Sequence, residues 1–184
     1  VDCQMMRIKE DFIYFENDGM QIIDLPYSQK KFSMTIVLPR KIGGLDSILT
    51  SLSGEKWQQW VEKMSKQEVR LFLPKFKMDY KIKLNQVLID LGMPAAFDPD
   101  RSNFAAINKE YADKIYIDEV LHKTFLEVDE KGTEAAAVTS ARMTVTSTYP
   151  PKEPVIMRVD HPFLFAIRER QTGNVLFIGK IRKP

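Results

Sequence analysis

Short apolar runs separated by turn signals open the chain and close it. The first three runs cover residues 12–15, 21–25 and 32–38, and Asn17-Asp18-Gly19 supplies a turn between the first two. Connections this short predict an antiparallel meander of three strands. Three more strand-like runs end the chain, at residues 155–159, 162–167 and 175–181.

Between these groups of strands the apolar residues change to helical spacing. Four of them recur at i, i+3, i+4 and i+7, which predicts one buried face of a short helix. They are Leu45, Ile48, Leu49 and Leu52. Ser53 is placed as the N-cap of a second helix that carries Trp57, Trp60, Val61 and Met64. A third helix is predicted over residues 82–91, with Gly92 as its C-cap.

The other strand candidates lie on either side of a predicted loop. Residues 69–76 have a strand-like pattern in which Pro74 must lie at an edge or a bulge, because proline has no N–H for the ladder. Residues 94–112 read as a loop and residues 114–128 as a long strand. Strands and helices are segregated more than alternated, which predicts an α+β fold with largely antiparallel sheets and a few short helices.

The composition is that of one ordinary globular domain. The 184 residues are enough to bury a core, and the 28% of charged and 44% of hydrophobic residues argue against disorder. The 27 Lys and Arg nearly balance the 25 Asp and Glu, so a net charge of +2 gives no reason to expect nucleic acid or a membrane as partner. No stretch approaches the ~18 apolar residues of a membrane span.

The single cysteine and the first residue add two expectations. Cys3 cannot form an internal disulfide, and cysteine-based metal motifs need several cysteines, so we expect an ordinary thiol, with a redox or crosslinking role as the alternative. The chain begins at Val1 without a Met or a signal-like segment. We therefore expect an internal piece of a longer protein, whose compartment is unknown.

One segment combines small side chains with the period of a strand. From Thr133 onward every second residue is small or apolar, whereas the charged residues Glu134 and Arg142 fall on the other face. This is the alternation of a strand with one buried face, although its alanines have poor strand propensity. Such a segment could exist as a solvated loop or as a strand in a sheet, and small side chains would keep the barrier to insertion low. A plain linker is the alternative.

The residues around this segment resemble those of the serpin family. Glu130-Lys131-Gly132-Thr133-Glu134-Ala135-Ala136-Ala137 resembles the hinge of an inhibitory serpin's reactive-centre loop, and residues 157–167 (MRVDHPFLFAI) resemble the signature that follows it. Leu121-His122-Lys123, Leu73-Pro74-Lys75 and Leu176-Phe177-Ile178-Gly179 also match serpin positions. The resemblance begins around the middle of a typical serpin. It implies that residues 1–184 are the C-terminal part of a single serpin domain, with residues 130–149 as the reactive-centre loop.

The resemblance implies a protease inhibitor that acts as a suicide substrate. A target serine protease would cleave the loop and form an acyl-enzyme, after which the N-terminal part of the loop would insert into the central sheet. The hinge and inserting loop would comprise Glu130, Gly132, Thr133, Glu134, Ala135, Ala136 and Ala137. The other strands of that sheet would come from an N-terminal half of the domain, joined or separate, which we expect this chain to need for stability and activity.

The reactive bond is predicted at Thr146-Ser147. Counting the family's loop length from Glu130 places the bond after Thr146, whereas counting back from Pro150-Pro151 gives Ser147-Thr148. Small residues here favour an elastase-like target over a trypsin-like one, with a cysteine protease as a further target class. The alternative cleavage sites are Arg142, Met143 and Tyr149. A cut at Arg142 would shorten the inserting strand and predicts substrate behaviour.

Two positions outside the inserting segment, His122 and Lys75, are assigned structural roles by the resemblance. His122 would lie on the strand before the loop and bond to the sheet-opening region, and Lys75 would pair with Glu130 at the top of the sheet. The alternatives are an ordinary histidine and a solvated Lys and Glu. His161-Pro162-Phe163 is expected to serve in packing.

An enzyme is not predicted. The chain has no G-x-S-x-G elbow, no phosphate-binding glycine loop and no H-E-x-x-H motif, so we expect no catalytic residue, no cofactor and no metal. Within the family the alternative is a non-inhibitory serpin, a carrier or chaperone-like protein whose loop is only a substrate, although Ala135-Ala136-Ala137 favours inhibition. The family favours a secreted location, with a cytosolic one as the alternative.

Overall fold

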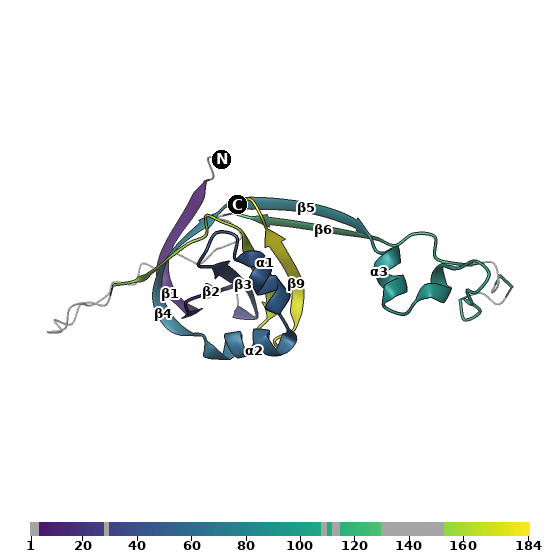
Figure 1. Cartoon of the computed structure of the whole chain (residues 1–184), viewed down its shortest axis with the longest axis horizontal. Helices are drawn as coiled ribbons and strands as arrows, with labels where there is room; N and C mark the ends of the chain where they lie inside the picture. Colours follow the sequence, from purple (N-terminus) through teal and green to yellow (C-terminus); the bar gives the residue numbers. More distant parts are fainter. Residues whose placement is uncertain (1–3, 28–29, 108–109, 112–114, 130–152) are drawn as a thin grey trace. The chain divides into compact units, whose positions relative to one another are not determined.

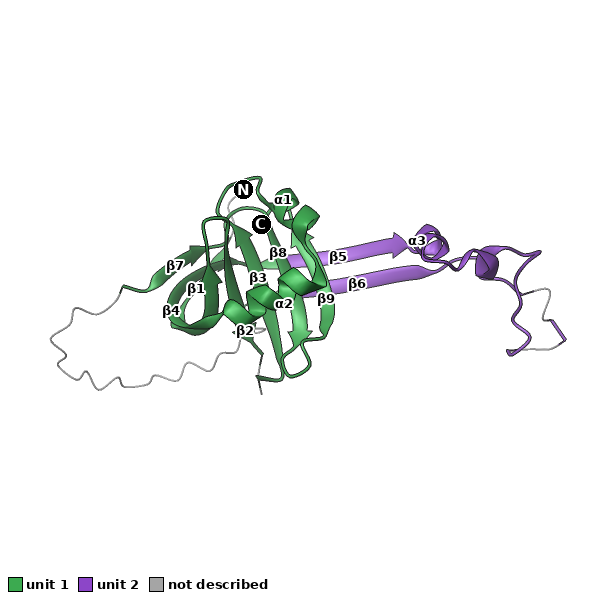
Figure 2. Ribbon diagram, turned by 60° about the horizontal axis from the view of Figure 1, so that its bottom comes forward, with its two compact units in different colours: residues 1–76, 128–184 green, residues 77–127 purple. Residues whose placement is uncertain are grey.

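The chain folds into two compact units. The computed structural model describes residues 4–27, 30–107, 110–111, 115–129 and 153–184. The first unit contains residues 1–76 and 128–184, and the second contains residues 77–127 (Figure 2). Strands dominate the described residues, which also hold three α-helices and one 3₁₀ helix. The predicted α+β class is confirmed.

The first unit is built on a seven-stranded sheet (Figure 1). In chain order its strands are β1 (Met5–Glu16), β2 (Met20–Pro26), β3 (Phe32–Pro39), β4 (Ser65–Pro74), β7 (Val155–Arg158), β8 (Phe163–Glu169) and β9 (Val175–Ile181). Their spatial order is β7-β4-β1-β2-β3-β8-β9, and every neighbouring pair is antiparallel except β4 with β7. The predicted meander is confirmed, since β1, β2 and β3 are consecutive neighbours. β1 is longer than predicted because its first half pairs with β4.

Two short helices, α1 (Leu45–Ser51) and α2 (Gly54–Lys63), supply the apolar cover of one part of this sheet. The Ser53 Oγ accepts a hydrogen bond from the Lys56 N–H at 3.2 Å, so the predicted N-cap is confirmed. The cluster contains the buried residues Met20, Ile22, Val37, Leu45 and Leu164, with Phe15, Ile48, Leu49, Leu52, Trp57, Trp60 and Met64 packed against it. The helical spacing read from the sequence therefore marks the buried sides of both helices.

The opposite face of the sheet is closed by a row of apolar side chains that runs from strand to strand. Tyr14, Ile23, Ile36 and Phe165 lie opposite one another in turn, and each is at most 1% exposed. The row ends at Gly179 of β9, opposite Phe165. An added Cβ at Gly179 would lie 2.6 Å from the Phe165 Cζ. The absence of a side chain at Gly179 thus makes the space that the aromatic ring fills, an arrangement known from glycines covered by a cross-strand aromatic.

Replacing Gly179 with Ala is expected to destabilise the protein by about 1–3 kcal/mol, because the ring of a fully packed Phe165 must move. The measurement is the thermal midpoint of the full-length protein. Gly54→Ala is the matched control, since nothing lies within 4 Å of a Cβ added there and alanine favours a helix. An unchanged midpoint for Gly179→Ala would contradict the close packing.

The second unit contains a two-stranded sheet of β5 (Phe76–Lys83) and β6 (Leu121–Val128). The first residue of β5, Phe76, and the last residue of β6, Val128, belong to the first unit. Between the strands lie α3 (Asn85–Asp90) and a 3₁₀ helix (Pro94–Phe97). The predicted strand over residues 69–76 is in fact the end of β4 and the start of β5, and Pro74 is the last residue of β4, beyond its pairing with β7. The predicted helix over 82–91 is shorter, and Gly92 follows it with φ +101°.

The prediction of one long strand over residues 114–128 was wrong, because only its second half is a strand. The preceding backbone bonds instead to the α3 region. The Asn85 amide donates to the Asp118 carbonyl at 2.7 Å and its oxygen accepts from the Val120 N–H at 2.9 Å. The Ile117 N–H donates to the Ala96 carbonyl at 2.9 Å. These partners satisfy the polar backbone groups that a strand neighbour would otherwise pair.

Candidate functional site: the strands on either side of the loop segment

The predicted reactive loop lies outside the residues that the structure describes. This holds for the hinge residues Glu130, Gly132, Thr133, Glu134, Ala135, Ala136 and Ala137, and for Arg142, Met143, Thr146, Ser147 and Tyr149. The structure does describe the strand before the segment, β6, and the strand after it, β7. The chain therefore leads from a strand of the two-stranded sheet to a strand of the seven-stranded sheet.

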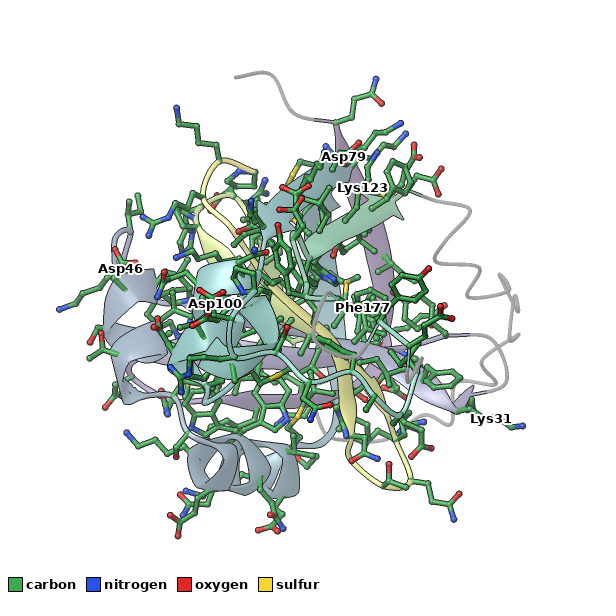
Figure 3. The ribbon with its side chains drawn as sticks, turned by 90° about the vertical axis from the view of Figure 1, so that its right-hand side faces the viewer. Lys31, Asp46, Asp79, Asp100, Lys123 and Phe177 are labelled. Atoms are coloured by element: carbon green, nitrogen blue, oxygen red, sulfur yellow. The ribbon has the colours of Figure 1, made fainter. Side chains whose placement is uncertain are left out.

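Three ion pairs join β5 to β6 and to the residues just before β6. Lys77 pairs with Glu127 at 3.7 Å, Asp79 with Lys123 at 3.5 Å (labelled in Figure 3), and Lys83 with Glu119 at 3.3 Å. The residue numbers rise on one strand as they fall on the other, so the strands run antiparallel. All six side chains are more than two-fifths exposed, and pairs of this kind contribute about 0–1 kcal/mol each. They fix register more than they add stability.

The two-stranded sheet presents apolar residues to solvent among the described parts of the chain. Leu121 and Phe125 on β6 are 49% and 54% exposed, and Tyr80 on β5 is 50% exposed. The Lys77 Nζ lies 5.0 Å from the centre of the Phe125 ring, a cation–π contact. An isolated pair of strands is marginal in water, and sheets normally bury at least one face. These strands are consistent with a part of a wider sheet.

His122 lies on β6, in the strand before the loop segment as predicted. Its Nε2 lies 2.8 Å from the Thr124 Oγ1, and the side chain is exposed. Lys75 lies between β4 and β5, where its N–H donates to the Gln4 carbonyl at 3.0 Å. Pairing of Lys75 with Glu130 stays a prediction because Glu130 is outside the described residues. The implied role of His122 at a sheet opening likewise stays a prediction.

Strand β7 is anchored in the core directly after the loop segment. Met157 is 0% exposed and lies opposite Leu71 of β4, and the N–H of the fully buried Val159 donates to the Phe72 carbonyl at 2.8 Å. The Gln21 amide donates to the Ile156 carbonyl at 3.0 Å and to the Tyr14 hydroxyl at 2.6 Å. Strand β7, which follows the predicted cleavage site, is thereby hydrogen-bonded to both β2 and β4.

The Tyr14 hydroxyl is the buried centre of this anchor. It donates to the Glu16 carboxylate at 2.5 Å, and Glu16 also pairs with Arg40 at 2.6 Å. Burial, followed by the hydrogen bond to Glu16, raises the pKa of the Tyr14 phenol well above its usual range. Tyr14 therefore stays protonated and acts as a hydrogen-bond donor across the ordinary pH range.

His161 connects the residues after β7 to β3. Its Nε2 lies 2.6 Å from the Pro39 carbonyl oxygen and its Nδ1 lies 2.8 Å from the Asp160 carboxylate. The neighbouring Phe163 is 0% exposed and its ring centre lies 5.7 Å from that of Phe76, in an edge-to-face arrangement. The expected packing role of His161-Pro162-Phe163 is confirmed, with a backbone contact added.

One buried polar cluster was missed in the sequence. Asp24, 1% exposed, accepts from the Thr35 hydroxyl at 2.7 Å and from the Arg168 guanidinium at 3.1 Å, and Arg170 lies 3.6 Å from its second oxygen. The Arg168 Nε also donates to the Thr35 Oγ1 at 3.0 Å. The signal was the single Asp inside the apolar run MQIIDLP and the Arg that continues FLFAI. A buried charge requires a partner, which these residues provide for one another.

The described residues hold no group of three or more His, Cys, Asp or Glu side chains that could bind a metal ion. None of the helices that the structure describes is long and apolar enough to span a membrane.

The fold and the sequence of the chain both match a known family of proteins. A solved structure described as a tumour-suppressing serpin matches 99% of this chain with a TM-score of 0.77 and 29% identity, and the match covers 47% of that structure. The family model for serpins, described as serine protease inhibitors, matches residues 1–184. The chain belongs to the serpin family, a family described by protease inhibition and not by an enzyme activity.

Relatives from distant organisms show the same partial overlap. The chain is 39% identical to an uncharacterized serpin-like protein of Thermococcus kodakarensis over 98% of this chain and 41% of the relative. It is 37% identical to Serpin B10 of Rattus norvegicus, covering 98% and 45%, and 36% identical to Serpin-Z2B of Triticum aestivum, covering 100% and 48%. The chain thus spans less than half the length of each of these relatives.

Proposed function

We propose that the complete protein containing this chain inhibits a serine protease by acting as a suicide substrate. The observation that carries the proposal is the hinge sequence from Glu130 to Ala137, which has small residues throughout its buried-face positions in a chain of the serpin family. Strand β6 would lead into the hinge. Strand β7 holds the residues beyond the loop in the core.

The chemistry belongs to the protease. Its serine hydroxyl attacks the carbonyl carbon of Thr146, an ester forms, the Thr146-Ser147 peptide bond breaks, and the Ser147 amine leaves with a proton that the protease supplies. Insertion of the hinge into the sheet would then pull the acylated protease along and distort its active site before water can hydrolyse the ester. Insertion requires a vacant position beside a strand of the receiving sheet, and β5 and β6 are strands of that sheet in this proposal.

The N-terminal half of a serpin domain is the partner that this mechanism needs. The relatives are more than twice as long as the matched region, and the exposed Leu121 and Phe125 of β6 have no apolar cover among the described residues. We expect the 184-residue chain alone to be neither cooperatively folded nor inhibitory, and an N-terminal half added as a separate chain to restore both. A monomeric, cooperatively folding and inhibitory 184-residue product would contradict this partner.

The proposal predicts a covalent complex. Incubation of the full-length protein with elastase-like serine proteases should give an SDS-stable band whose mass is that of the two proteins less the released fragment that begins at Ser147. Trypsin-like proteases should cut at Arg142 and be released, because that cut shortens the inserting strand by four residues. Cysteine proteases are tested in the same assay.

Cleavage without any SDS-stable band, across all three protease classes, would support the second candidate, a non-inhibitory serpin whose loop is only a substrate. In that case family membership and fold would stand and inhibition would not. The masses of the fragments identify the cleaved bond in either case. A C-terminal fragment that begins at Thr148 would place the reactive bond at Ser147-Thr148, one residue later than predicted.

A further inference from the structure

Three neighbouring strands of the seven-stranded sheet place cationic side chains on one face. In the registers of β1, β4 and β7, Arg7 lies opposite Phe72, and Phe72 lies opposite Arg158. One row further along, Lys9 lies opposite Arg70, and Arg70 lies opposite Ile156. Residues directly opposite one another in neighbouring strands share a face of the sheet. We call this set the arginine face: Arg7, Lys9, Arg70, Phe72, Ile156 and Arg158.

The arginine face is the solvent side of this part of the sheet. Arg7, Arg70 and Arg158 are exposed, and Ile156 is 59% exposed. Leu71 and Met157, the intervening residues of the same strands, are 2% and 0% exposed and form core on the other side. The exposed Ile156 places an apolar side chain beside the cations, whereas Met157, the next residue in the chain, is buried.

The three arginines have no acidic partner among the described residues. Lys9 pairs with Glu68 at 3.5 Å, but no ion pair is found for Arg7, Arg70 or Arg158 in the part of the chain that the structure describes. The guanidinium carbons of Arg7 and Arg158 lie 5.8 and 4.2 Å from the centre of the Phe72 ring. Stacking on the ring restrains each guanidinium and leaves its N–H donors for another acceptor.

This geometry selects the chemistry of a partner. Strands lie about 4.8 Å apart, so the Arg7 and Arg158 backbones are separated by about 10 Å, a span that suits two or more carboxylates on one partner segment. Arginine beside a half-buried aromatic residue is a combination enriched in protein–protein interfaces, and the exposed Ile156 adds apolar surface next to it. Phe72 and Ile156 therefore favour an acidic protein segment with apolar residues over a polysaccharide, which would offer them little.

We infer that the arginine face is a docking surface for an acidic segment of the target protease. The inference rests on the proposed function, and it adds a determinant of protease choice outside the reactive bond. Strand β7, which contributes Arg158, follows the predicted reactive loop in the chain, so a protease bound to that loop would be a partner near this face. Unpaired charges at the edge of an interface mainly raise association rates at low ionic strength.

The test uses the full-length protein and two charge-matched variants. R7E/R70E/R158E reverses the arginine face, and K41E/K56E/K63E makes the same change in net charge at exposed positions on or near α1 and α2. Inhibition of small-residue-specific serine proteases with acidic and with basic surfaces is followed as a second-order rate constant. For an acidic protease at low salt, we expect the first variant to be slower by about tenfold or more and the control to change little. The difference should vanish near 1 M salt, where the Debye length is about 3 Å.

A second measurement does not depend on inhibition. Binding of a fluorescein-labelled peptide EELEELEE is measured by anisotropy, with heparin as the competing probe, and the neutral variant R158Q serves if the triple reversal fails to fold. Peptide binding that is lost with the arginine face and kept in the control supports an acidic partner for this face. If no protease is trapped, the proposed function fails, and with it the target protease as that partner. Equal inhibition rates and equal peptide binding for all variants would overturn the inference while trapping stands. Binding of heparin without the peptide would also overturn it.

Discussion

Replacing Thr133 with Arg is expected to convert the full-length inhibitor into a substrate. Thr133 is the first residue of the small-residue face, so its side chain must be buried before the rest of the loop can insert. Burying an unpaired guanidinium costs at least several kcal/mol, which makes insertion slower than hydrolysis of the acyl-enzyme. We expect the SDS-stable complex to disappear while cleavage at the reactive bond continues at a rate close to that of the native protein.

The matched control is Glu134→Arg. This residue is adjacent in the chain but falls on the other face of the two-residue period, which carries both charges of the segment. Insertion should tolerate an arginine on that face, and the yield of complex should remain near that of the native protein. Equal loss of complex in both variants would indicate general disruption of the loop. Normal trapping by Thr133→Arg would contradict the insertion mechanism.

Replacing Asp24 with Ala is expected to have the largest effect on stability, a loss of about 3–5 kcal/mol. The substitution leaves the Arg168 guanidinium, only 7% exposed as a side chain, without its acidic partner inside the sheet. It also removes the acceptor of the Thr35 hydroxyl. The measurement is the thermal or urea midpoint of the full-length protein, with loop cleavage excluded by gel.

Two further variants separate charge from shape at this position. Asp24→Asn keeps the size and one acceptor but removes the charge, and should still be strongly destabilising because Arg168 remains charged and buried. The double variant Asp24→Leu with Arg168→Met replaces the pair by apolar groups of similar volume and should recover most of the loss. A loss of less than about 1 kcal/mol for Asp24→Ala would show that the arginine finds another partner.

The elements that could be predicted from the sequence are those whose own residues determine them. Helix α2 was readable because Ser53 caps it and its apolar residues recur at helical spacing. Strands β2, β3 and β9 were readable because each is a mostly apolar run bounded by turn signals. The first half of β1 was missed although Met6 and Ile8 alternate with charged residues, because Glu10 interrupts the alternation.

Features that depend on distant partners could not be read in the same way. The stretch before β6 has the β-branched and aromatic composition of a strand, but the Asn85 side chain bonds to its backbone groups, and nothing in the local pattern indicates this. The hinge and the signature after the loop were readable as motifs. The arginine face was not, because Arg7 and Arg158 come together only through a parallel pairing of β7 with β4 that no short-range signal specifies.

The interleaving of the seven-stranded sheet has a consequence for the cleaved protein. Strands β7, β8 and β9 all follow Thr146 in the chain, yet β7 pairs with β4 and β8 pairs with β3. A cut at the reactive bond therefore separates two polypeptides whose strands share one hydrogen-bonded ladder and one core. The nicked molecule would behave in native solution as a single particle of unchanged mass, and its two pieces would separate only after denaturation.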